Sequence, residues 1–195
     1  MKKSLLTLAL LISFGVYSQK EYGEFTSSDG KVIYKSKVVL EGKSTGSVYM
    51  DFSDDGKNAM NFKNEKSRLE FLDFVNTSYE KFKGWKTTAE ENDVSDLNKD
   101  IDEANLGDAI SFYYGSWKFR FGGNSVRAIM NIKEGKVVYY LYFGKVTASD
   151  NRYIESDSQL LVLYDKDVES LNKVLSTEVI DKFIKEQASQ ADLFD

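Results

Sequence analysis

Large apolar side chains alternate with polar ones along much of the chain, and pairs ending in Gly interrupt the alternation. A period of two is typical of strands that bury one face. A pair ending in Gly between two such stretches is typical of a hairpin turn. The chain is therefore expected to contain several antiparallel hairpins. Three pairs occupy such positions: Asp29-Gly30, Asp55-Gly56 and Glu134-Gly135.

The first two pairs predict four strands, near residues 21–27, 31–41, 46–53 and 58–63. In the second hairpin the apolar residues match when Phe52 faces Met60. Met50 then faces Phe62. This pairing requires a turn longer than two residues, so we expect a bulged or five-residue turn around residues 54–57.

After residue 65 the spacing of the apolar residues changes from two to three or four. Such spacing is typical of an amphipathic helix. It predicts a helix from about residue 65 to 83, and leaves open a continuation past Gly84 toward Glu91. The apolar stripe of this helix consists of Leu69, Leu72, Val75, Tyr79 and Phe82.

Two further helices are predicted near the C-terminus, after a last strand at residues 160–164. The first begins at Asp165, a residue type favoured at helix N-termini. The second begins at Ser176 or Thr177 and reaches Ala188. Both helices need an apolar partner, so we expect them to pack on the sheet.

The segment from Glu90 to Glu103 contains seven acids and one lysine. Within it, oxygen-bearing side chains alternate as they do in the first half of a calcium-binding loop. Ile101 and Gly107, however, stand where such a loop requires Gly and Glu. We therefore interpret the segment as a solvated acidic connector. The alternating residues are Asp96, Asn98, Asp100 and Asp102.

Between residues 109 and 121 the large apolar residues change from even to odd positions. A bulge at Gly115-Ser116 would return all of them to one buried face. Lys118 and Arg120 would then lie on the opposite face. The apolar residues are Ile110, Phe112 and Tyr114, followed by Trp117, Phe119 and Phe121.

A two-residue turn at Glu134-Gly135 fixes the register of the strands around it, because Lys133 must then face Lys136. The facing pairs on one side are apolar throughout, and we expect this side to be the core face. A slip of one residue would exchange the two faces, so the apolar pattern supports the register. The core pairs are Val126 with Phe143, Ala128 with Leu141, Met130 with Tyr139, and Ile132 with Val137.

The reverse side of this hairpin mixes aromatic, polar and charged residues, because Arg127 faces Tyr142, Ile129 faces Tyr140, and Asn131 faces Val138. Three interpretations are open. The rings reinforce the sheet, a helix or the curling of the sheet covers them, or they form a binding platform. Tyr and Arg are favoured at binding hot spots. The platform would consist of Lys118, Arg120, Arg127, Tyr140 and Tyr142.

Hairpins combined with amphipathic helices predict an α+β fold, with a mainly antiparallel, meandering sheet and helices packed on one face. The sequence contains no internal repeat, low-complexity linker or break in composition. Residues 19–195 are therefore expected to form a single domain.

The N-terminal segment has the layout of a secretory signal. Lys2 and Lys3 precede an apolar run at residues 5–16, and small or neutral residues follow up to Ser18. A dozen apolar residues are too few to span a bilayer, which takes about 20 in a helix. We expect residues 1–18 to be a cleaved signal peptide of an exported bacterial protein. The protein would be periplasmic or secreted, without stable membrane insertion.

Three features of the composition exclude or disfavour whole classes of chemistry. The chain has no Cys, which excludes lipid anchoring through a cleavage-site cysteine. It has no His, which excludes Ser-His-Asp and Cys-His catalysis and His-ligated zinc. Its net charge of −5 disfavours nucleic acid, whose binding depends on Lys and Arg. We expect no cofactor, no metal and no nucleic-acid partner.

These features favour a non-catalytic binding or interaction module, whose partner is an envelope protein, an extracellular polymer or a small ligand. One alternative is a glycosidase-like hydrolase that uses two carboxylates, which require no His. It predicts a deep cleft with two inward-facing acids. Another alternative is a protein inhibitor or immunity-type partner, which predicts an exposed charged edge and no cleft.

Overall fold

The computed structural model describes residues 18–28, 31–41, 44–53, 55–106 and 109–191. This part of the chain contains ten strands and three helices. All strand pairs are antiparallel, and the strands are divided between two sheets. The predicted α+β fold is thus confirmed.

The six-stranded sheet has the strand order β1-β2-β3-β4-β6-β7, and the four-stranded sheet has the order β10-β9-β8-β5. The strands of the first sheet are β1 (Ser18–Thr26), β2 (Ile33–Glu41), β3 (Ser44–Asp51), β4 (Asn58–Phe62), β6 (Ala109–Tyr114) and β7 (Ser116–Phe121). Those of the second are β5 (Asp96–Leu106), β8 (Asn124–Lys133), β9 (Lys136–Gly144) and β10 (Gln159–Val162). The helices are α1 (Glu65–Glu91), α2 (Asp165–Val174) and α3 (Thr177–Ala191).

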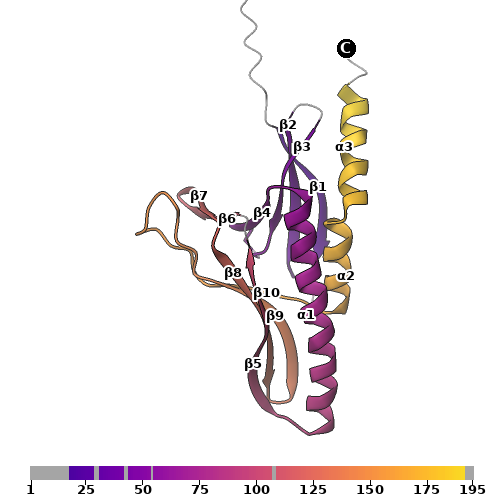
Figure 1. Ribbon diagram of the computed structural model, residues 1–195, viewed down its shortest axis with the longest axis vertical. Coiled ribbons are helices and arrows are strands. Elements are labelled where there is room, and N and C mark those ends of the chain that lie inside the picture. Colours follow the sequence, from indigo (N-terminus) through magenta and orange to yellow (C-terminus); the bar gives the residue numbers. More distant parts are fainter. Residues whose placement is uncertain (1–17, 29–30, 42–43, 54, 107–108, 192–195) are drawn as a thin grey trace, which may run out of the picture.

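Figure 1 shows the three helices along one side of the molecule, with α1 running from the six-stranded sheet to the far end of the four-stranded sheet. The predicted first helix is confirmed, and it continues through Gly84 to Glu91. Its first turn is capped by Asn64, whose side chain accepts a hydrogen bond from the Ser67 backbone N–H at 2.9 Å. Leu69, which the apolar spacing placed in the buried stripe, is 44% exposed.

One apolar core joins both sheets to the helices. On α1, Phe71 contacts Phe62 of β4 with ring centres 5.5 Å apart. Two turns further along the helix, Tyr79 meets Tyr139 of β9 edge to face at 5.0 Å. The Tyr139 hydroxyl also hydrogen-bonds the Ser78 hydroxyl at 2.8 Å. A single helix therefore packs against both sheets.

The turn at Glu134-Gly135 is confirmed. Both residues have positive φ, 52° and 75°, as the two central residues of a type I′ turn require. Met130 faces Tyr139 as predicted, and both are buried. The same register holds for the pairs from Arg127–Tyr142 to Lys133–Lys136.

The predicted register of the β3–β4 hairpin is wrong by two residues. Met50 faces Met60, and Val48 faces Phe62. The turn has five residues, one of the two predicted alternatives, because the Phe52 N–H donates to the Asn58 carbonyl and residues 53–57 lie between them. The Ser53 hydroxyl accepts hydrogen bonds from the backbone N–H groups of residues 57 and 58, at 3.1 and 3.0 Å. A shift of two keeps every side chain on its own face, so the predicted burial still holds.

The predicted acidic connector is also wrong, because residues 96–106 form strand β5. This strand pairs with β8 along its whole length and lies at the edge of the four-stranded sheet. Charged residues are typical of exposed edge strands, since they discourage pairing with other chains. Ile101 is its one buried residue among those whose burial the structure describes.

The bulge predicted at Gly115-Ser116 is a chain reversal. Tyr114 pairs with Ser116, and β6 and β7 form an antiparallel hairpin around Gly115. Gly115 has a φ of 66°, a conformation that Gly adopts without a steric penalty.

The predicted signal peptide lies almost entirely outside the described residues and stays a prediction, as does the single-domain assignment. Among the described helices, none is both long enough and apolar enough to cross a membrane.

Two glycines provide a test of the packing. A Cβ on Gly23 of β1 would lie 2.6 Å from Cγ2 of Val174 on α2, whereas a Cβ on Gly84 of α1 would meet no atom within 4 Å. Because Val is stiff, we expect Gly23→Ala to lower the free energy of unfolding by about 1–3 kcal/mol. Gly84→Ala should raise it by about 1 kcal/mol through helix propensity. Urea denaturation of both variants measures the two effects, and an unchanged Gly23→Ala variant would contradict the packing of α2 on β1.

Candidate binding groove

The outward face of the six-stranded sheet carries a groove, because small residues lie between large ones across neighbouring strands. Asp51, Ala59, Ser111 and Phe119 face one another in one row across β3, β4, β6 and β7. Ala59 and Ser111 are small and occupy the middle of the row. The sheet therefore forms a trough between its flanking strands.

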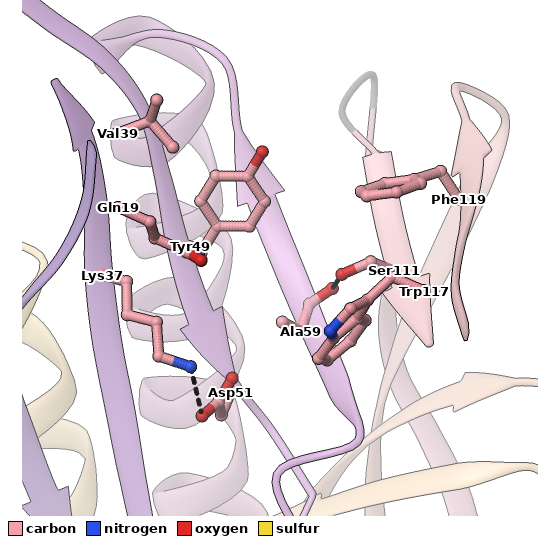
Figure 2. Close-up of a pocket in the computed structure, with 9 residues that line it drawn as sticks. All are labelled: Gln19, Lys37, Val39, Tyr49, Asp51, Ala59, Ser111, Trp117 and Phe119. Atoms are coloured by element: carbon pink, nitrogen blue, oxygen red, sulfur yellow. Dashed lines mark hydrogen bonds and ion pairs between the residues drawn. The ribbon is translucent and has the colours of Figure 1, made fainter. Parts of the chain in front are cut away.

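The groove has a volume of about 280 Å³. Figure 2 shows Lys37, Tyr49 and Asp51 on one side of it, and Trp117 and Phe119 on the other. Aromatic rings thus stand on both walls above a floor of small side chains. Among the described residues, the lining consists of Gln19, Lys37, Val39, Tyr49, Asp51, Ala59, Ser111, Trp117 and Phe119.

The aromatic wall on β7 corrects the predicted burial of this strand. Trp117 is 44% exposed and Phe121 is 69% exposed, although both were expected to continue the buried face. Because the chain reverses at Gly115, Trp117 pairs with Tyr113 and shares its outward face. Lys118 pairs with the buried Phe112 instead, so it lies on the inner side of the hairpin.

The groove contains one base and one acid, and they form an ion pair. Lys37 Nζ lies 3.7 Å from Asp51 Oδ2, and Asp51 is only 5% exposed. Burial raises the pKa of Asp51, and the attraction of Lys37 opposes this only in part. Burial likewise raises the pKa of Tyr49. The polar part of the groove is therefore electrically balanced.

The floor offers the hydroxyl of Ser111, and Asn61 lies beside it on the same face, outside the lining. The Ser111 hydroxyl lies 3.3 Å from the carbonyl oxygen of Ala59 and 3.4 Å from Oδ1 of Asn61. The Nδ2 group of Asn61 is buried and finds no hydrogen-bond partner among the described residues. A buried donor without a partner is costly and uncommon in folded proteins.

The five residues predicted as a platform are divided between the two sheets. Lys118 and Arg120 belong to β7, whereas Arg127, Tyr140 and Tyr142 belong to β8 and β9. Lys118 forms an ion pair with Asp150 at 3.3 Å. Whether these residues bind a ligand stays a prediction.

Arg127 and Tyr142 already contact each other on the reverse face of the four-stranded sheet. The Arg127 guanidinium lies 4.8 Å from the centre of the Tyr142 ring and forms an ion pair with Asp100 at 3.2 Å. The Tyr142 hydroxyl donates to the Ser158 hydroxyl at 3.3 Å. Helix α1 packs on the Tyr139 side of the sheet, so it does not cover this half-exposed face.

Sequence reasoning missed the groove because it assigned the odd-numbered aromatic residues of β7 to the core. The only signal was Gly115 itself, which is compatible with a turn as well as with the predicted bulge. A positive-φ turn at Gly115 would place Trp117 beside Tyr113, and these two rings do contact each other edge to face, with centres 5.9 Å apart. Among the described residues, no three side chains of His, Cys, Asp or Glu gather as a metal site would require.

Comparison with known proteins gives no relative: no family model matches the chain, and neither a curated protein nor a solved structure is significantly similar to it.

The raised pKa of Asp51 predicts a pH dependence of stability. Its stabilising contribution is fully present below its unfolded pKa, near 3.9, and is lost as pH rises through the higher folded pKa. Asp51→Asn should therefore gain stability relative to the wild type as pH rises from about 4 to 7. The pKa of Asp102 is lowered by its hydrogen bond with Lys81, so Asp102→Asn should show the opposite trend. Denaturant titrations at several pH values measure both, and trends of the same sign would contradict this assignment.

The half-exposed face of β9 gives a second prediction. Tyr139→Ser should lower the free energy of unfolding by about 3–5 kcal/mol, because it empties a buried site. Tyr140→Ser should cost about 1 kcal/mol or less, since this ring only partly contacts cross-strand neighbours. Equal losses in the two variants would mean that the Tyr140 face is covered.

Proposed function

We propose that the protein is a non-catalytic binding module and that the groove on the six-stranded sheet binds a segment of a neutral saccharide. The observation that carries this proposal is the combination of aromatic rings on both walls with an ion pair that leaves the groove without net charge.

The chemistry of the lining supports a ligand with apolar faces and polar edges. Tyr49, Trp117 and Phe119 offer ring faces, and sugar rings present C–H surfaces that pack on such faces. Gln19, Lys37, Asp51 and Ser111 offer donors and acceptors for hydroxyl groups. A few polar groups among apolar ones are typical of sites that bind small molecules.

The ion pair disfavours a charged ligand. An anionic sugar would meet the buried carboxylate of Asp51, and a cationic ligand would compete with Lys37 for it. A neutral ligand leaves the pair intact. The export signal expected at residues 1–18 would bring the protein to extracellular polymers, which supports a saccharide rather than a cytoplasmic metabolite.

Two observations weigh against the alternatives. A hydrolase of the glycosidase type needs two carboxylates that face each other across the site, and the lining of this groove contains one, Asp51. An inhibitor or immunity-type protein would present a charged edge without a cleft. Strand β5 is such an edge, but the groove on the other sheet is a cleft that this alternative does not predict.

A second candidate surface is the reverse face of the four-stranded sheet, where Arg127 lies against Tyr142. Tyr and Arg in contact and half exposed are typical of protein interfaces. We propose it as a site for an envelope protein, separate from the saccharide groove.

The groove is tested by tryptophan fluorescence. The chain has two Trp residues, so Trp85→Phe leaves Trp117 as the sole reporter. In this background, maltohexaose, cellohexaose or chitohexaose should change the Trp117 emission, and hexagalacturonate should change it less at the same concentration. Calorimetry with the wild type gives the affinity for the sugar that responds.

Substitutions then locate the site. Tyr49→Ala and Trp117→Ala should each weaken binding of that sugar by about tenfold or more, as expected for aromatic anchors. Tyr153→Ala removes a ring that is 80% exposed and absent from the groove lining, and it should leave binding unchanged. No response to any neutral sugar, or equal losses in all three variants, would contradict the proposal.

A further inference from the structure

The four edge strands of the two sheets differ in their protection. An unprotected edge presents unpaired backbone N–H and C=O groups to which another strand can add. Strands β1 and β5 both carry charged residues. On β7, the Phe119 carbonyl accepts from the Ser149 backbone N–H at 2.8 Å, and the Phe121 N–H donates to the Ser149 hydroxyl at 3.0 Å. Three of the four edges are therefore protected.

Strand β10 lacks these protections. Its sequence is Gln-Leu-Leu-Val, without a charge, and Leu160 is 52% exposed. Leu163 donates its N–H to the Tyr139 carbonyl of β9, so the alternation of an antiparallel ladder directs the N–H and C=O groups of Leu160 and Val162 away from β9. Among the described residues, no backbone partner from outside the sheet meets these two.

A groove of about 330 Å³ borders this edge. Leu160, Val162 and Tyr164 line it on one side, and Ser27 and Val32, at the end of the β1–β2 hairpin, line it on the other. An added strand would therefore find space for some of its side chains beside β10. Side chains on one of its faces would also continue the aromatic face, since Leu160 faces Tyr142 and Val162 faces Tyr140.

The charges near β10 decide between a second copy and a different partner. Two copies paired antiparallel about Leu161 would bring Asp157 of one copy toward Asp165 of the other, and like charges opposite each other are destabilising. Both acids are exposed. They are complementary to basic residues at the two ends of an added strand.

We propose that β10 is a strand-addition site for an extended segment of a partner protein with an apolar centre and basic ends. Main-chain hydrogen bonds to Leu160 and Val162 hold the segment, and its alternate side chains pack beside Tyr140 and Tyr142. This site is separate from the saccharide groove and does not depend on it.

The probe is the capped peptide Ac-Lys-Val-Thr-Val-Thr-Lys-amide, added to the ¹⁵N-labelled protein at millimolar concentration. The expected result is a shift of the Leu160 and Val162 amide resonances and slower hydrogen exchange of both amides. A peptide with Glu at both ends should bind more weakly. A peptide with alternate N-methylated amides should not bind, because it cannot form the ladder.

Two variants locate the site. Leu160→Pro removes an outward N–H without removing a bond to β9, a position where edge strands tolerate Pro, and it should weaken peptide binding at least tenfold while the melting temperature stays close to that of the wild type. Asp157→Lys should weaken binding of the Lys-ended peptide by up to about fivefold and should strengthen binding of the Glu-ended peptide. Trp117→Ala should bind both peptides as the wild type does, which separates this test from that of the groove.

The proposal is overturned by absence of the Leu160 and Val162 shifts with the Lys-ended peptide, or by equal binding of the N-methylated peptide. Sedimentation of the free protein tests whether two copies of the chain pair through β10. A dimer that Leu160→Pro dissociates would assign the edge to a second copy of the chain and would refute the basic partner.

Discussion

The burial of one face of α1 against both sheets is the interaction on which the rest of the structure depends. The helix has 27 residues, which corresponds to about 40 Å. Phe71 packs on Phe62 of the six-stranded sheet, while Tyr79 and Phe82 pack on Tyr139 of the four-stranded sheet. Because strands expose alternate side chains on opposite faces, this contact decides which face of each sheet is inside. The groove and the Tyr142 face lie on the opposite faces of the sheets. Helix α1 does not cover these faces, so their residues are not required to be apolar.

How much of this the sequence could predict depends on how local the determining contacts are. The Glu134-Gly135 hairpin was predictable to the residue because a two-residue turn leaves one register in which every core pair is apolar. The β3–β4 register was wrong by two residues, since the hydrogen bonds of the Ser53 hydroxyl determine where the turn begins and no apolar pattern records them. Strand β5 was not predicted, because edge strands often carry charged residues and then lack the alternation of apolar and polar residues. In both cases the structure depends on side-chain hydrogen bonds or on the position of a strand at a sheet edge, and a local apolar pattern records neither.

The candidate groove was missed for a different reason. Seven of its nine lining residues are polar or aromatic, and single residues of these types give no signal until neighbouring strands bring them onto one face. The error began at Gly115. A bulge and a reversal use the same Gly, but the bulge buries Trp117 whereas the reversal exposes it. Sequence alternation cannot distinguish the two, because it describes which residues share a face and not which face is covered.

The polar groups of the groove are difficult to explain as parts of a purely structural sheet. Asp51 is buried with a raised pKa, which means that its ionised form destabilises the folded state, and the pairing with Lys37 offsets this only in part. Asn61 leaves a buried donor without a described partner on the same face. Apolar residues at these positions would avoid both costs. Ser111 connects them, since it lies in the row of Asp51 and donates toward Asn61. Two such costs on one face of the sheet, at Asp51 and Asn61, are expected at sites kept for binding rather than for stability.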